Sequence, residues 1–223
     1  MLAAPGAKLE PRSPGQPIFS NKYGPGLEHI AIETNSIEKD VAHLRELGMP
    51  IFSDKVFCAP DGFEAFIYPD KTLAMTVELI QPHTTSWGYP DDGGKVSSLM
   101  GIRQLHHVGV AVRDVKAAAE LFKKLFGQAF TGARLPFDND CWLEFLACDK
   151  PGSHVYELLD KNGPGIEYVA LETTSLASDA NILNAAGVVE IKASDNGSES
   201  VDEVWIDGAH VAGTTVELVP LKV

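Results

Sequence analysis

The stretch that decides the fold is LHHVGVAVRDVKAAAELFKKLFG, Leu105–Gly127, because altered copies of it occur on both sides. The upstream copy is LEHIAIETNSIEKDVAHLRELG, Leu27–Gly48, and the downstream copy is IEYVALETTSLASDANILNAAG, Ile166–Gly187. Each copy has an apolar strand pattern, a turn and an amphipathic helix pattern that stops at a glycine suited to the left-handed position after a helix. The chain therefore contains a threefold internal repeat.

A second landmark follows each copy at a nearly constant distance. It is a glutamate inside an apolar strand pattern, found in the segments TVELIQP, VYELLD and TVELVP. The glutamates lie 49 positions after His29, 50 after His107 and 49 after Tyr168, and they are Glu78, Glu157 and Glu217. The repeat unit is therefore predicted to be a strand, a helix and a return through further strands, with the glutamate in the last one.

Composition limits what such a repeat can be. With 223 residues, 44% of them hydrophobic, the chain has enough material for three globular units of about 60 residues each. A net charge of −13 argues against nucleic acids and anionic membranes as partners. We expect a cytoplasmic protein, because the sequence has no signal peptide, no apolar run of membrane-spanning length and no CxxC pair among its three cysteines.

Proline and glycine content predicts the domain boundaries. We expect an irregular lead over 1–24, a single module over 25–82, a linker over 83–103 and a two-module domain over 104–223. The second and third modules are assigned to one domain because the segment between them, LLDKNGPG, is short.

Within the modules, we expect helices from about 37 to 47 and from about 115 to 126, the latter capped by Asp114. Hairpins are expected from 63–68 with 73–80 and from 142–148 with 154–159, and a closing strand pair from 204–207 with 214–219. Strand alternation places His29 and His107 on the sheet face that points away from the helices.

At these residues the sequence resembles the vicinal oxygen chelate superfamily, which includes glyoxalases, bleomycin-resistance proteins and extradiol dioxygenases. The segments HHVGVAV and GPGIEYVALE look most like those of methylmalonyl-CoA epimerases. The resemblance implies an α+β fold of repeated βαβββ modules, here three, whose mixed sheets form a cup. It also implies metal ligands at the first-strand histidines and last-strand glutamates, which are His29, Glu78, His107, Glu157 and Glu217.

Such a ligand set suits a divalent Mn, Fe, Co, Ni or Zn ion, because imidazole nitrogens and carboxylate oxygens form a mixed shell. A metal of this kind can stabilise an enolate while a nearby base moves a proton. Glu144 and Glu64, each on the strand before the ligand glutamate of its module, are candidate bases, and Glu203 matches them in the third module. Solvated edge-strand charges are the alternative interpretation of these residues.

The sequence departs from the family pattern in two ways. Three modules leave one unpaired within the chain, so we expect a homodimer in which the first module meets its own copy across a two-fold axis. Tyr168 stands where a histidine ligand is expected, and a phenol with an ordinary pKa of about 10 binds divalent metals poorly at neutral pH. The site between the second and third modules is therefore expected to have three protein ligands or no metal.

The favoured function is a metal-dependent isomerase or lyase of glyoxalase or epimerase type, acting on a small oxygenated carbon acid. Tyr168 then serves as a weak ligand or as a hydrogen-bond donor to the substrate. Two alternatives stay open at this point: an extradiol-type ring-cleaving dioxygenase, and a metal-free protein of bleomycin-resistance type that binds a small molecule.

Overall fold

The computed structural model describes residues 26–27, 29–60, 62–68, 75–83, 100–127, 134–136, 141–188, 190–192, 203–211 and 213–221. The predicted lead lies outside these ranges, and so does most of the predicted linker. By their contacts, Glu28–Asp92 and Val110–Ile166 belong to one compact unit, and Gly93–Gly109 and Glu167–Val223 to a second. The division into a single module and a two-module domain stays a prediction.

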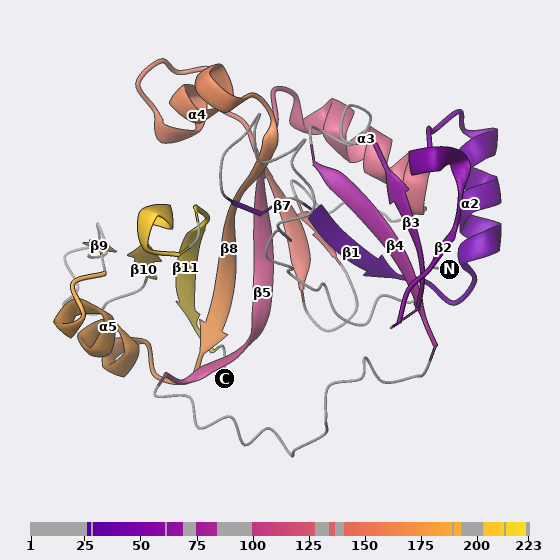
Figure 1. Cartoon of the computed structure of the whole chain (residues 1–223). Coiled ribbons are helices and arrows are strands. Elements are labelled where there is room, and N and C mark those ends of the chain that lie inside the picture. The colour runs from indigo at the N-terminus through magenta and orange to yellow at the C-terminus, as the bar shows by residue number, and fades with distance from the viewer. Residues whose placement is uncertain are drawn as a thin grey trace. The chain divides into compact units, whose positions relative to one another are not determined.

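The first module has the predicted βαβββ order (Figure 1). Its elements are β1 (His29–Glu33), α2 (Ile37–Glu46), β2 (Phe57–Cys58), β3 (Gly62–Ile67) and β4 (Thr76–Pro82). The sheet order is β1-β4-β3-β2, with β1 parallel to β4 and the other pairs antiparallel. A short 3-10 helix, η1 (Phe52–Asp54), precedes β2.

The amphipathic pattern of the first helix determines which sheet face carries the polar residues. Ile37, Val41 and Leu44 are the buried residues of α2, which contacts β3 and β4. In the parallel register of β1 and β4, Ala31 lies beside Glu78. Because side chains two positions apart on a strand share a face, His29 and Glu78 lie on the same face of this sheet.

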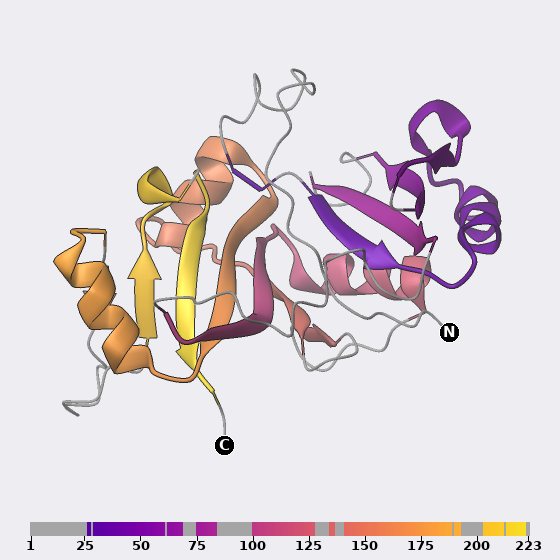
Figure 2. The same ribbon diagram turned by 60° about the horizontal axis from the view of Figure 1, so that its bottom comes forward.

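The third module repeats this arrangement. It consists of β8 (Gly165–Thr173), α5 (Leu176–Ala185), β9 (Glu190–Lys192), β10 (Glu203–Ile206), η4 (Gly208–His210) and β11 (Thr215–Pro220). Its strand order, β8-β11-β10-β9, matches that of the first module, and Figure 2 shows α5 beside these strands. Ala170 pairs with Glu217 as Ala31 pairs with Glu78. The internal repeat is therefore structural, and the predicted α+β fold of mixed sheets is confirmed.

The middle module differs at its end. It contains β5 (Ile102–Ala111), α3 (Val115–Phe126), β6 (Arg134–Pro136), β7 (Trp142–Leu146) and then α4 (His154–Asn162). Asp114 caps α3 as predicted, accepting a hydrogen bond from the N–H of Ala117 at 3.0 Å.

The predicted strand over 154–159 is wrong, because α4 occupies these residues. The Ser153 side chain caps α4 by accepting from the N–H of Tyr156, and Gly163 ends the helix at φ +76°. Val155, Leu158 and Leu159 follow the i, i+3, i+4 spacing of a helix face, and Leu159 is buried. Local capping therefore outweighs an apolar run that also resembles a strand.

β7 takes the place that the last strand has in the other two modules. The N–H of Val112 donates to the carbonyl of Leu146 at 2.8 Å, just as the N–H of Thr34 donates to the carbonyl of Ile80 at 2.8 Å. Each donor lies five positions after the first-strand histidine of its module. The two acceptors each lie two positions after a strand glutamate, and these are Glu144 and Glu78. Glu144 is therefore the counterpart of Glu78 in the middle module.

The larger sheet has seven strands in the order β6-β7-β5-β8-β11-β10-β9. β5 and β8 run antiparallel, because contacts pair Gly101 with Thr174 and Gln104 with Glu172. The N–H of Gly101 also donates to the buried carboxylate of Asp179, at 3.0 and 3.1 Å to its two oxygens. These contacts fix the register of the two strands.

No helix in the described ranges is long and apolar enough to span a membrane.

The three cysteines differ in burial, and this difference predicts how fast each thiol reacts. Burial raises the pKa of the Cys141 thiol to about 11, whereas Cys58 is exposed and the hydrogen bond with Ser153 lowers the pKa of Cys148. At pH 8 only about 0.1% of Cys141 is then thiolate, the reactive form. We expect a chromogenic aromatic disulfide to label two thiols rapidly in the folded protein and the third only after unfolding. Equal labelling rates for all three thiols would contradict the structure. So would a smaller number of rapidly labelled thiols in Cys141→Ala than in the wild type.

Candidate functional site

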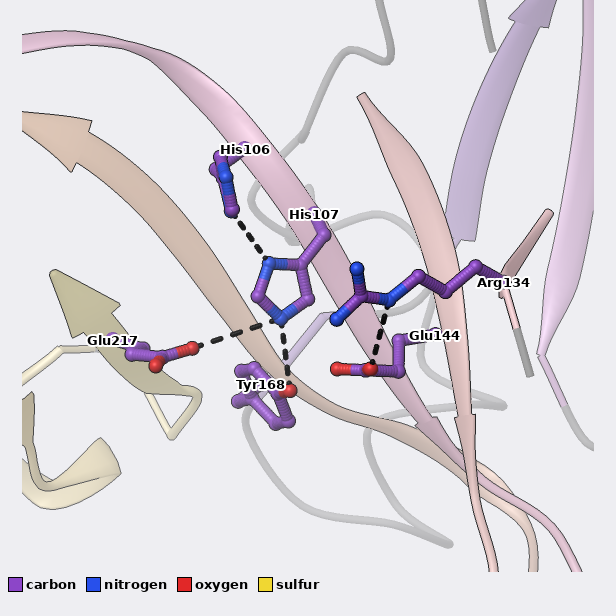
Figure 3. A network of polar contacts seen from close by, with 6 residues as sticks. All are labelled: His106, His107, Arg134, Glu144, Tyr168 and Glu217. Atoms are coloured by element: carbon purple, nitrogen blue, oxygen red, sulfur yellow. Dashed lines mark hydrogen bonds and ion pairs between the residues drawn. The ribbon is translucent and has the colours of Figure 1, made fainter. Parts of the chain in front are cut away.

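A buried histidine forms the centre of the candidate site. His107 comes from β5, and its Nε2 lies 2.9 Å from the hydroxyl of Tyr168 on β8 (Figure 3). Its Nδ1 lies 2.9 Å from Nδ1 of His106. Only one of two facing ring nitrogens can carry the shared proton, so the contact with His106 links the tautomers of the two rings.

Tyr168 reaches His107 because of a glycine. Gly109 lies two positions after His107 on the same face of β5, and a Cβ atom added there would lie 2.1 Å from the Tyr168 ring. Any larger residue at position 109 would displace the ring. The glycine of the HHVGVAV segment therefore makes the room in which the phenol lies against β5.

A carboxylate completes the cluster. Glu217, on β11, places its Oε2 3.6 Å from Nε2 of His107, and both side chains are about 7% exposed. A buried carboxylate is costly unless a charged or hydrogen-bonding group compensates it. Figure 3 shows the imidazole of His107 pointing toward both Glu217 and Tyr168. One nitrogen and two oxygens from three strands thus converge.

The donor set fits a divalent metal in chemistry and spacing. Zinc bonds of about 2.0–2.2 Å to nitrogen and oxygen place two ligands of one ion about 3–3.5 Å apart, close to the separation of the His107 and Glu217 atoms. Within the described residues, however, no three His, Cys, Asp or Glu side chains gather as metal ligands. The third donor here is the Tyr168 hydroxyl, and metal binding at this cluster stays a prediction.

The first module carries the same pair. Nε2 of His29 lies 3.1 Å from Oε2 of Glu78, and the two side chains are 14% and 7% exposed. The His29 ring meets Phe66 edge-on, with centroids 6.5 Å apart. The structure thus brings His29 to Glu78 and His107 to Glu217, each as one imidazole beside one carboxylate.

Glu144 lies on β7, where its Oε1 is 3.3 Å from Nε of Arg134. Arg134 also lies over the Trp142 ring at 4.8 Å. Sequence reasoning did not identify Glu144 as the counterpart of Glu78. It identified each glutamate by its distance of 49 or 50 positions from the first-strand residue, and Glu144 lies only 37 positions after His107. The pattern WLEFL, with its glutamate between apolar neighbours, is the signal that could have found it.

Glu157 lies in the first turn of α4, where its exposed carboxylate accepts from the N–H of Gly152 at 3.1 Å. The strand on which its prediction as a ligand depended is absent, because α4 forms there. His106 is a neighbour of the site that the sequence pattern did not identify. Its contact with His107 depends on ring orientations that a strand pattern does not predict.

No protein-family model and no curated protein matches the sequence. Among solved structures, a triple mutant of 4-hydroxymandelate synthase from Streptomyces coelicolor is similar at a TM-score of 0.64 and 14% identity, over 93% of this chain and 75% of that one. Methylmalonyl-CoA epimerase from Mycobacterium tuberculosis matches at a TM-score of 0.47 and 23% identity, over 57% and 92%. An epimerase variant from Streptomyces coelicolor in complex with 2-nitronate-propionyl-CoA matches at 0.45 and 22%, over 53% and 94%.

At these identities the likeness concerns the fold. The similarity to the synthase extends over nearly the whole chain and agrees with the repeated modules described above. The protein has the vicinal oxygen chelate fold.

Proposed function

We propose that the protein is a metal-dependent isomerase or lyase that acts on a small oxygenated carbon acid. The observation that carries the proposal is the buried cluster of His107, Tyr168 and Glu217, in which Nε2 of the histidine lies 2.9 Å from the phenol and 3.6 Å from the carboxylate. A buried imidazole beside a buried carboxylate is a costly arrangement that a bound cation would stabilise.

His107 and Glu217 are the residues that would hold a divalent Mn, Fe, Co, Ni or Zn ion. Such an ion, when bound, supplies the Lewis acid that lowers the energy of an enolate. In this proposal the proton shared with His106 lies on Nδ1 of His107, which leaves Nε2 of His107 as the electron-pair donor. Tyr168 then has its hydroxyl available to donate to a substrate oxygen that gains negative charge.

Glu144 has two possible roles in this proposal. As the predicted base, it would move the proton at the carbon of the substrate. As the counterpart of Glu78, it would bind the metal in place of Glu157. In the structure this carboxylate forms an ion pair with Arg134, with Oε1 3.3 Å from Nε.

One observation favours a metal-free binding protein as the second candidate. The Tyr168 hydroxyl contacts Nε2 of His107, the nitrogen that would otherwise bind the metal. If the phenol keeps its hydrogen bond to this nitrogen, no metal binds there, and the cluster would hold a small polar molecule through hydrogen bonds alone. No observation separately favours ring cleavage of the extradiol type.

We also propose that two copies pair through the first module. In the larger sheet, β5 and β8, the first strands of two modules, are neighbours, whereas β1 lies at the edge of its sheet. An edge strand offers unpaired backbone groups to another chain. Pairing of β1 with its own copy would bring the two His29 and Glu78 pairs together, as β5 and β8 bring His107 to Tyr168.

Tyr168 distinguishes the candidate functions. Tyr168→Phe should lower turnover by about 10²-fold to 10³-fold, because a donor to developing negative charge is lost. Metal content, measured by elemental analysis after loading, should stay nearly unchanged. Tyr168→His adds an imidazole ligand and should tighten metal binding. Deuterium exchange at the α-carbon of acyl thioesters and 2-oxo compounds reports the activity. Absent exchange, with metal content unaltered in Tyr168→His, would favour the binding protein.

Glu144→Gln tests the role of the carboxylate with almost no change in shape. If Glu144 is the base, the variant should keep its metal and lose α-carbon exchange by about 10²-fold or more. If it is a ligand, metal affinity should fall together with exchange. Glu157→Gln is the matched control, since its exposed carboxylate lies on α4, and we expect it to leave both measurements unchanged.

The dimer is tested by sedimentation velocity across a range of concentrations. Because the N–H of Thr34 points toward β4 and successive N–H groups of a strand alternate in direction, that of Ala31 points to the opposite edge of β1. Ala31→Pro should therefore remove a donor from the pairing edge and give monomers, while Ala31→Ser stays dimeric. A wild-type protein that is monomeric at every concentration would contradict the proposal.

A further inference from the structure

We infer that Trp205 and Tyr168 form an aromatic wall beside the His107 and Glu217 pair, and that the ligand of this site carries a flat conjugated group next to its chelating oxygens. The inference rests on the proposed function and specifies its substrate class. It follows from strand register, ring geometry and burial, all within the unit that contains β8 to β11.

The register of β10 and β11 places the indole beside the carboxylate. Trp205 is the direct antiparallel partner of Glu217. Directly opposed residues of an antiparallel pair point to the same face, with Cβ atoms about 4.5–5.5 Å apart. Trp205 therefore shares the sheet face of Glu217.

The aromatic rings form a continuous row on this face. The Tyr168 and Trp205 centroids lie 5.1 Å apart at an interplanar angle of 68°, and those of His107 and Tyr168 lie 5.4 Å apart at 86°. Edge-to-face contacts of this kind hold rings in a defined orientation. Gly109 fixes the middle ring, since only a residue without Cβ leaves room for Tyr168 against β5.

Burial differs along this row in a way that points to a ligand. His107, Tyr168 and Glu217 are buried, whereas Trp205 is half-buried. Part of the Trp205 side chain thus remains accessible, and its ring contacts Tyr168, which adjoins the buried imidazole and carboxylate. Small-molecule sites combine such apolar walls with a few fixed polar groups. The polar end of this site suits two neighbouring oxygens on a metal, and the wall suits the planar remainder of the same molecule.

Two hydroxamates test the inference, because both chelate metals through neighbouring oxygens and differ only in the attached group. Binding of benzohydroxamate and acetohydroxamate to the Mn-loaded or Co-loaded full chain is measured by calorimetry. We expect the phenyl compound to bind about tenfold more tightly, as an aromatic contact contributes. Trp205→Ala should reduce this difference to about twofold, and Trp205→Phe should retain most of it. Phe52→Ala, a change at an exposed aromatic residue of η1, serves as the control and should leave the difference unchanged.

The outcomes separate the inference from the proposed function. Equal binding of the two hydroxamates by the wild type, or a tenfold difference that survives in Trp205→Ala, overturns the aromatic wall and leaves metal binding intact. Metal uptake without binding of either compound also overturns it. A protein that takes up no metal overturns the wall and the proposed function together. Thermal unfolding of each variant checks that the fold is retained, and Trp205→Phe keeps the test valid if Trp205→Ala is unstable.

Discussion

The antiparallel pairing of β5 with β8 is the constraint on which the candidate site depends. It sets His107 against Tyr168, which hold the same position in their respective modules. The contacts of Gly101 with Asp179 and Thr174 fix the register at the far end of the pair. A shift of one residue in this pairing would turn His107 to the opposite face of the sheet and separate it from Tyr168 and Glu217. The contacts at the strand ends thus maintain the register that the site requires.

A second constraint, the pairing of the last strand of a module with its first, places a carboxylate beside the first strand. The last strand pairs in parallel with the first, so that a glutamate in it lies on the face of the first-strand residue. His29 with Glu78, and His107 with Glu217, are two outcomes of the same rule. In the second case the carboxylate comes from the neighbouring module, since Tyr168 holds the histidine position in the third. Burial of such pairs costs stability unless the polar atoms are compensated, and the proposed metal would add to that compensation.

The middle module shows how far a repeat unit can change while a strand glutamate keeps its place beside the first strand. α4 replaces a strand, yet β7 makes the hydrogen bond to the end of β5 that β4 makes to the end of β1. Glu144 consequently occupies the position of Glu78 although fewer residues separate it from its histidine. The position of a side chain on a sheet depends on strand pairing, and the number of residues between strands is free to vary.

From the sequence alone came the repeat, the helix capped by Asp114 and the first-strand histidines, because these depend on local periodicity and on residue types with fixed backbone preferences. The sequence also placed Glu78 and Glu217 in strands that the structure confirms. The helical conformation of VYELLD has local signals in the cap Ser153 and in Gly163, although its apolar run also fits a strand. That Glu144 is the counterpart of Glu78, and that His106 and Trp205 adjoin the cluster, was settled only by the tertiary structure. These features depend on which strands pair and how rings turn, and such contacts join residues distant in sequence.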